Sequence, residues 1–140
     1  AEDARKNGKE IGGLETIRDQ LGAMASLPSQ FHIDGMIEML ALGPRMKDIF
    51  ETMTVLYVQG DIGMIFPLMR SVSPDDTASG QKYAEFEEKM ISARNRTMAE
   101  RAEPIIAKGN AFIAVGALHL PGEQGLVSLL KKQNYTVTAH

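Results

Sequence analysis

The sequence of 140 residues contains no cysteine. This absence excludes a disulfide, a thiolate nucleophile and a zinc site with cysteine ligands. Tryptophan is missing as well, whereas there are nine methionines, a residue that fills irregular spaces in a hydrophobic core. The hydrophobic share of 44% and the charged share of 24% are typical of an ordinary globular protein. Length and composition therefore predict a single folded domain over residues 1–140.

Clusters of positive charge and long apolar runs are also lacking. Fifteen Lys and Arg residues stand against eighteen Asp and Glu residues, which gives a net charge of -3. Because the basic residues are scattered along the chain, nucleic acid is not an expected partner. No apolar run approaches the roughly 20 residues that a membrane-spanning helix needs, so no membrane span is expected.

The common motifs of hydrolases and nucleotide-binding proteins are absent too. The sequence has no His-Glu-x-x-His helix, no Walker loop, no Gly-x-Ser-x-Gly elbow and no Gly-x-Gly-x-x-Gly fingerprint. Their absence removes the common signatures of hydrolases and nucleotide-binding proteins.

Most of the chain has the apolar spacing of amphipathic helices. Residues 17–27 show this spacing, Thr16 with Asp19 resembles a capping box, and Pro28 supplies a stop. The region 46–57 has one apolar face and begins after a break at Gly43-Pro44. The most regular helix is expected over about 81–108, and its buried stripe consists of Tyr83, Phe86, Met90, Met98 and Ile105.

Arg94 falls inside this apolar stripe, between Met90 and Met98. Two interpretations are open. The arginine can extend from the edge of the core or form a structural ion pair there. Alternatively, its guanidinium group points into a polar functional site.

The residue pattern in the last third of the chain predicts β-strands. The apolar run 111–115 has strand length, a loop rich in glycine follows, 126–130 has the stripe of a short helix, and 135–138 resembles a final strand. A short strand is also expected over about 10–15. We therefore expect a helix-rich α/β fold, with a β-sheet that is covered by helices and contains a parallel β-loop-α-β unit at the C-terminus.

The predicted sheet directs attention to His119, which lies four residues past Val115. Ligands gather at the carboxyl ends of parallel strands, and Glu15 would reach the same edge from its own strand. Gly116 leaves room for a close backbone approach, and Glu123 adds a carboxylate before the following helix. A histidine and a carboxylate at one point can hold a divalent metal or form an acid/base pair. A hydrogen-bonded loop histidine is the structural alternative.

Four segments, in order, resemble the TraB/PrgY/GumN family, to which the TIKI metalloproteases also belong. The first three are Gly13-Leu14-Glu15-Thr16, Tyr57 with Gly60-Asp61, and Arg94-Asn95 with Met98-Ala99. The fourth is the long run from Phe112 to Gly125, followed by Leu129-Leu130-Lys131 and Tyr135-Thr136-Val137. The resemblance covers nearly the whole chain.

The resemblance implies a family defined by two Gly-x-x-His motifs together with a glutamate and an arginine, and for TIKI a peptidase that uses manganese or cobalt. Gly116 and His119 match the second motif, Glu15 matches the glutamate, and Arg94, followed by Asn95, matches the arginine. The implied roles are metal ligand for His119, metal ligand or general base for Glu15, and oxyanion stabiliser for Arg94.

One departure from the family pattern limits this expectation. No other glycine in the sequence is followed three residues later by histidine, so the first Gly-x-x-His motif is missing. We expect the chain to be the C-terminal part of a TraB/GumN-like domain, with the other half of the site on a missing N-terminal segment or on another copy in a homo-oligomer. One His and one Glu are too few ligands for a metal ion, so the chain is expected to be inactive alone.

Two functional hypotheses follow from the resemblance. The first is a metal-dependent hydrolase, with a peptide or protein as substrate. The second is a non-catalytic protein that binds peptides or regulates signalling, because TraB and PrgY are associated with the shutdown of peptide pheromone signalling. A bacterial cell-envelope or periplasmic location is the expectation at the level of the family.

Overall fold

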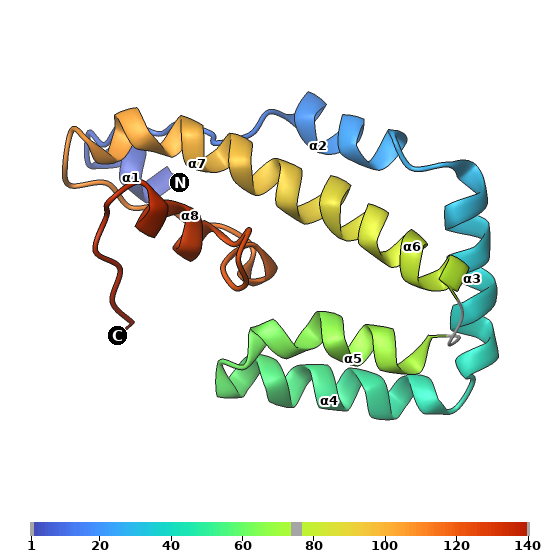
Figure 1. Cartoon of the computed structure of the whole chain (residues 1–140). Helices are drawn as coiled ribbons and strands as arrows, with labels where there is room; N and C mark the ends of the chain where they lie inside the picture. The colour runs from blue at the N-terminus through green and yellow to red at the C-terminus, as the bar shows by residue number, and fades with distance from the viewer. Residues whose placement is uncertain (1, 74–76, 140) are drawn as a thin grey trace.

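The computed structural model describes residues 2–73 and 77–139, and within these ranges all regular secondary structure is helical. The helices are α1 (Glu2–Lys6), α2 (Ile17–Ala25), α3 (Ser29–Leu42), α4 (Arg45–Gln59), η1 (Ile62–Met64), α5 (Ile65–Val72), α6 (Thr77–Glu87), η2 (Glu88–Ser92), α7 (Ala93–Ile106), η3 (Ala117–His119) and α8 (Leu126–Lys132). Figure 1 shows one long rod from α6 to α7, with α2 beside it, α8 under α7, and α4 and α5 forming a separate hairpin.

The predicted α/β fold is therefore wrong: the described residues contain no β-strand, and the parallel β-loop-α-β unit does not form. The short helix of that unit is present as α8, but the run 111–115 makes no backbone hydrogen bond to any other segment of the described chain. A strand needs a neighbour at about 4.8 Å to satisfy its backbone groups. Among the described residues no such neighbour pairs with this run. Val115 packs against the core, and Phe112 is 93% exposed.

Local signals in the sequence predict some helix ends well, such as the start of α2 and the end of α4, whereas the long helix spans 77–106 and not 81–108. The capping box before α2 is confirmed, since Thr16 Oγ1 accepts from the backbone N–H of Asp19 at 3.1 Å and Asp19 Oδ2 accepts from that of Thr16 at 2.8 Å. Helix α4 ends at Gly60, whose φ of 83° is a left-handed conformation that glycine adopts without strain. These ends follow from contacts between neighbours in sequence, which explains why they could be predicted.

The long helix consists of α6, the π-helical segment η2 and α7. Its predicted buried stripe is confirmed at Met98, which is 3% exposed, but Ile105 is 38% exposed and lies outside the core. In η2 the Ala93 N–H donates to the Glu88 carbonyl, five residues back instead of four. A π-helical turn shifts the register of the residues that follow it, and such turns are common beside functional sites.

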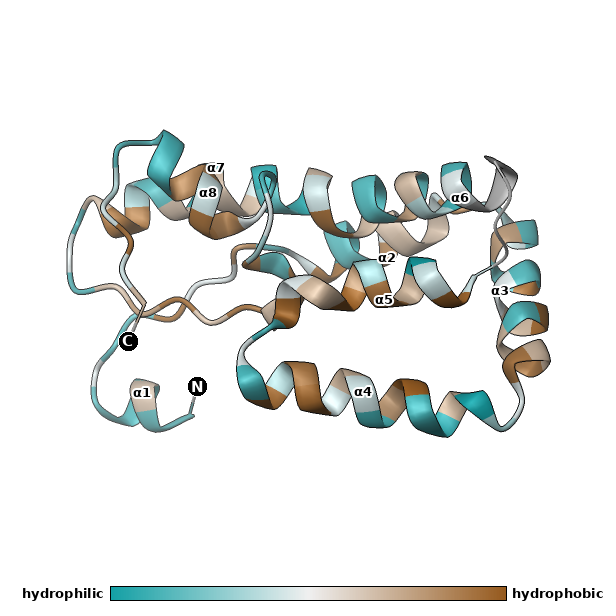
Figure 2. Cartoon of the chain, turned by 60° about the horizontal axis from the view of Figure 1, so that its bottom comes forward, coloured by the Kyte–Doolittle hydropathy of each residue, from teal (hydrophilic) through white to brown (hydrophobic). Residues whose placement is uncertain are grey.

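The packed core lies where α7 meets α8. It is formed by Met98, Ala99 and Leu126, with Leu14, Val115 and Leu129 against them. Elsewhere large apolar side chains are exposed, above all on α3 and α4, whose ribbons carry bands of hydrophobic residues in Figure 2. None of the helices in the described ranges has the length and hydrophobicity to cross a membrane.

Candidate functional site

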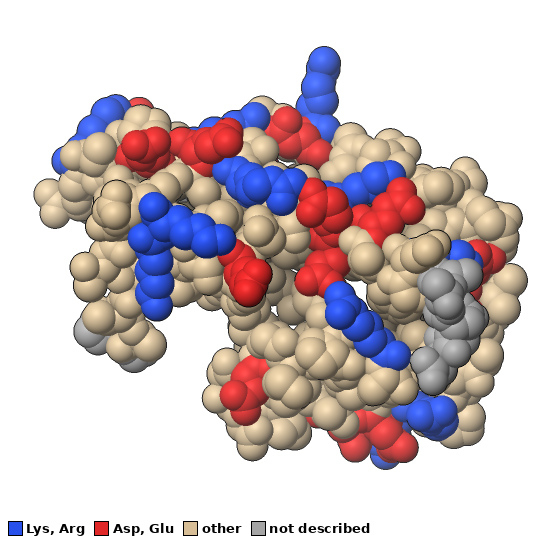
Figure 3. Space-filling model, viewed as in Figure 1, with Lys and Arg blue, Asp and Glu red and all other residues tan. Residues whose placement is uncertain are grey.

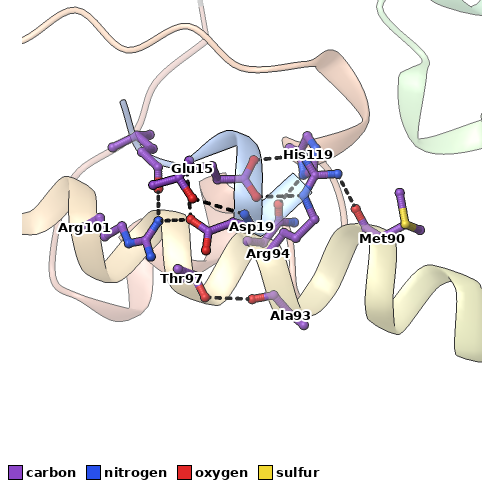
Figure 4. A network of polar contacts seen from close by, with 11 residues as sticks. Glu15, Asp19, Met90, Ala93, Arg94, Thr97, Arg101 and His119 are labelled. Carbon is purple, nitrogen blue, oxygen red and sulfur yellow. Dashed lines mark hydrogen bonds and ion pairs between the residues drawn. The ribbon is translucent and has the colours of Figure 1, made fainter. Parts of the chain in front are cut away.

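The centre of the candidate site is an ion pair between Glu15, just before α2, and Arg94, in the first turn of α7. Arg94 Nε donates to Glu15 Oε1 and Arg94 Nη2 donates to Glu15 Oε2, both at 2.8 Å. The Arg94 side chain is only 17% exposed and the Glu15 side chain only 9%. A bidentate pair of this kind holds both groups in one orientation, as Figure 4 shows.

The guanidinium group is held from a second direction. Arg94 Nη1 donates at 2.9 Å to the backbone carbonyl of Met90, one turn earlier and within η2. A guanidinium has five N–H donors, and these three contacts leave two of them without a partner among the described residues. Arg94 can therefore bind a further oxygen without giving up Glu15.

The charges of this pair stabilise each other. The hydrogen bond from Arg94 lowers the pKa of Glu15 below 4.5, although desolvation opposes the shift. The hydrogen bond to Glu15 likewise raises the pKa of Arg94. Glu15 is thus a carboxylate at neutral pH, with both oxygens already engaged.

His119 reaches the same place from the loop after residue 115. Its backbone N–H donates to the Gly116 carbonyl at 2.9 Å, which closes the single turn η3. A Cβ built at Gly116 would lie 3.6 Å from Cδ2 of the His119 ring, an ordinary van der Waals contact. The turn thus folds the imidazole back beside the glycine, where the histidine is 9% exposed.

Asn95 connects this histidine to the long helix. Its Oδ1 lies 2.6 Å from His119 Nδ1, and its Nδ2 donates at 2.7 Å to the carbonyl of Gln124. Asn95 has an exposed fraction of 0%. One buried amide therefore joins α7 to both ends of the loop that carries His119.

The surroundings of His119 favour its neutral form. Burial is the main cause that lowers its pKa below 6.5, and the positive charge of Arg94 adds to this, while Glu15 acts in the opposite direction. A neutral imidazole at physiological pH can accept a proton or bind a metal ion.

The structure brings together three of the predicted site residues, Glu15, Arg94 and His119 (Figure 4). Gly116 and Asn95 lie beside His119. The structure does not bring in Glu123, whose side chain is exposed and bonds to none of the others. The backbone carbonyl of Glu123 accepts a hydrogen bond from Lys132 Nζ, outside the cluster. The sequence analysis missed the carbonyls of Met90 and Gln124, because backbone groups leave no trace in residue identity.

A divalent metal ion fits this site only in part. Within the described residues no group of three or more His, Cys, Asp or Glu side chains could hold an ion. His119 and Glu15 supply two donors, and both Glu15 oxygens already bind a guanidinium, whose charge opposes a nearby cation. This donor set alone does not make a complete metal site.

Two open grooves flank the cluster. One has a volume of about 360 Å³ and is lined by Glu15, Arg94 and small residues of α2 and α7. The other, of about 520 Å³, is lined by residues 116–119 and by mainly apolar side chains of α4, η1 and α5, including Phe50 and Tyr57. Acidic and basic side chains alternate over the face in Figure 3, without an extended patch of one sign.

Comparison with known proteins identifies the family. The family model that matches is described as the TraB/PrgY/gumN family, and it covers residues 1–139. No curated protein and no solved structure matches the chain significantly. Because the match spans essentially the whole chain and contains the Glu15, Arg94 and His119 cluster, this protein belongs to the TraB/PrgY/gumN family.

Proposed function

We propose that the protein provides the His119 end of a metal-dependent hydrolase site that acts on peptide bonds. One observation carries the proposal: a partly buried Glu15–Arg94 ion pair and a buried Asn95–His119 hydrogen bond meet at one place, although their partners are separated by 79 and 24 positions. Buried charged and titratable groups that converge in this way are more typical of functional sites than of a loosely packed helical surface.

His119 is suited to move the proton in such a reaction. The neutral imidazole accepts a proton from water as the oxygen attacks the scissile carbonyl, and it returns the proton to the departing amine when the C–N bond breaks. Burial keeps the ring neutral, which leaves it ready to accept that proton. Water thus adds across the amide bond without any further reactant.

Arg94 is suited to bind the negative charge that develops on the carbonyl oxygen. Its two remaining N–H donors are fixed in direction by the contacts to Glu15 and Met90. Donors that are oriented in advance stabilise an oxyanion better than mobile ones, because they do not need to reorganise during the reaction. In this scheme Glu15 holds the arginine in place.

A metal ion in this proposal would take its ligands chiefly from another copy or another polypeptide segment, because the free lone pair of His119 serves the proton transfer and both oxygens of Glu15 already bind Arg94. A bound divalent ion polarises a carbonyl and lowers the pKa of bound water. The donor set of the described residues supports only this shared arrangement.

The second candidate function is binding of peptides without cleavage. The open groove beside residues 116–119 favours it, because apolar side chains such as Phe50, Met53 and Ile65 dominate its lining and suit the side chains of an extended peptide. A protein that sequesters peptides needs this groove but does not need His119.

The test measures cleavage of a mixed peptide pool by mass spectrometry, with the protein together with the copy or polypeptide segment that completes the site, with manganese or cobalt added and with both removed by a chelator. His119→Ala is compared with His32→Ala, since His32 is an exposed histidine of α3 whose side chain, among the described residues, contacts only the ring of Phe31. We expect metal-dependent cleavage that is lost in His119→Ala and kept in His32→Ala.

Cleavage that persists in His119→Ala would overturn the proposal. Intact peptides under every condition, with peptide binding equal in the wild type and in His119→Ala, would overturn it in favour of the binding function.

A further inference from the structure

We propose that Asn95 is a positioning residue that fixes the tautomer of His119, with the proton on Nδ1 and the lone pair on Nε2. The inference rests on the proposed function only for the use that it assigns to Nε2, the atom that would accept a proton or bind an ion. The tautomer itself follows from hydrogen bonds.

The orientation of the Asn95 amide is set at its far end. The Gln124 carbonyl can only accept, so the atom that faces it at 2.7 Å is the NH₂ group of Asn95. The opposite atom is therefore Oδ1, which faces His119 Nδ1 at 2.6 Å. Because an amide oxygen can only accept, Nδ1 of the neutral ring carries the proton.

Burial fixes the Asn95 amide in this orientation. Asn95 is fully buried and His119 is 9% exposed, so water cannot replace either partner easily. Turning the amide over would place Oδ1 against the Gln124 carbonyl, so that two acceptors face each other and the buried carbonyl loses its donor, whatever the tautomer of His119. Because a buried polar group without a partner is unfavourable, the flipped state is disfavoured.

The other ring nitrogen remains available. Nε2 makes no hydrogen bond to the described chain, and the only fully buried side-chain atom without a partner there is Gln133 Oε1. Nε2 therefore keeps contact with the surface, where residues 116–119 line the open groove. A neutral imidazole with Nδ1–H presents its lone pair at this accessible position.

The helix places Asn95 for this task. Asparagine is a poor helix former, and its side chain competes with the backbone for hydrogen bonds, so the interior of a helix is an unfavourable position unless the amide has other partners. Asn95 follows the π-helical segment η2 by three residues, and its amide turns toward the loop between η3 and α8.

The experiment reads the tautomer directly. Nitrogen-15 NMR of the protein with labelled histidine is recorded at about pH 9, where imidazoles are neutral. The chain has three histidines, so the signals of His119 are assigned by their loss in a His119→Asn variant. Asn95→Ala removes both amide contacts, Asn95→Asp keeps the acceptor for Nδ1–H but loses the donor to Gln124, and Thr97→Val is the control on the same helix.

We expect the proton on Nδ1 in the wild type, in Thr97→Val and in Asn95→Asp, and a shift toward Nε2–H in Asn95→Ala. Peptide cleavage should fall about 10- to 100-fold in Asn95→Ala, through kcat and not KM, and Asn95→Asp should restore most of it. Nε2–H in the wild type, or the same tautomer in Asn95→Ala, would overturn the inference. A correct tautomer pattern in a protein that cleaves no peptide would overturn the proposed function and leave the role of Asn95 standing.

Discussion

The Glu15–Arg94 ion pair provides the sharpest test of the site as a physical object. Breaking a fully buried ion pair by removing one partner costs about 3–5 kcal/mol, whereas an exposed pair contributes about 0–1 kcal/mol. With side chains 9% and 17% exposed, this pair lies between these limits but closer to the buried one. We expect Glu15→Ala to lower the free energy of unfolding by about 2–3 kcal/mol, because Arg94 Nε and Nη2 lose their acceptors.

A double-mutant cycle separates the pair from other effects of the substitutions. The variants are Glu15→Ala, Arg94→Ala and the double variant, and urea denaturation is the assay because urea, unlike guanidinium, does not screen ion pairs. The expected coupling energy is about 1–2 kcal/mol. The control is the same cycle for Glu88 and Arg96, which pair on the same long helix with side chains 54% and 44% exposed, and which should couple by less than about 0.5 kcal/mol.

The pH dependence gives this prediction a second criterion. The pKa of Glu15 is lowered in the folded protein, so its stabilising contribution is fully present above the unfolded value of 4.5 and is lost as the pH falls through the folded value. The coupling energy should therefore be constant from neutral pH to about pH 5 and decrease below it. A coupling no larger than that of the control pair, or one that is independent of acid, would refute the buried and ionised arrangement.

Three further predictions concern stability. Asp19→Asn should reduce stability at neutral pH, because Arg101 and Thr16 lower the pKa of Asp19 to about 2 in the folded protein. The difference in stability from the wild type should disappear as the pH falls from 3.8 through about 2. Acid titrations followed by circular dichroism measure this difference, and a difference that stays constant would contradict the prediction. Met98→Ala should cost about 2–4 kcal/mol in urea denaturation, since Met98 is 3% exposed in the core, and a loss below about 1 kcal/mol would contradict that packing. Gly125→Ala should lower the unfolding temperature of the protein more than Gly116→Ala does. A Cβ at Gly125 would lie 2.1 Å from the Pro121 carbonyl oxygen, whereas a Cβ at Gly116 would lie 3.6 Å from the His119 ring. Equal unfolding temperatures of the two variants would argue against this loop geometry.

Much of the helical structure could be predicted, because its signals are local. The capping box of Thr16 with Asp19 and the stop at Gly60 depend on residues a few positions apart. The buried face of α4 was predicted with partial success: Ile49 is buried, but Phe50 and Tyr57 are 57% and 63% exposed. Periodicity shows which face is apolar, but only the neighbouring elements decide how much of that face is covered.

The strands were mispredicted for a related reason. A short apolar run such as 111–115 is compatible with a strand, yet a strand exists only when a second segment lies beside it. In the described structure that run leads from α7 to η3 without such a neighbour, so the expected sheet edge is absent. Glu15 and His119 do lie close together, but not for the predicted reason. They meet around Arg94 on a helix and not at the end of a sheet.

The sequence by itself determined the chemistry that is available: one acidic, one guanidinium and one imidazole group in segments that match a family, with no cysteine to compete with them. It also determined some helix ends, such as the start of α2 and the end of α4, since caps and glycine stops act between near neighbours. Only the tertiary structure decided that Glu15 gives both oxygens to Arg94, that the Gln124 carbonyl orients Asn95, and that Asn95 faces Nδ1 of His119. These contacts join residues 24 to 79 positions apart, and a hydrogen bond over such a separation depends on how helices and loops pack, which residue identity does not encode locally.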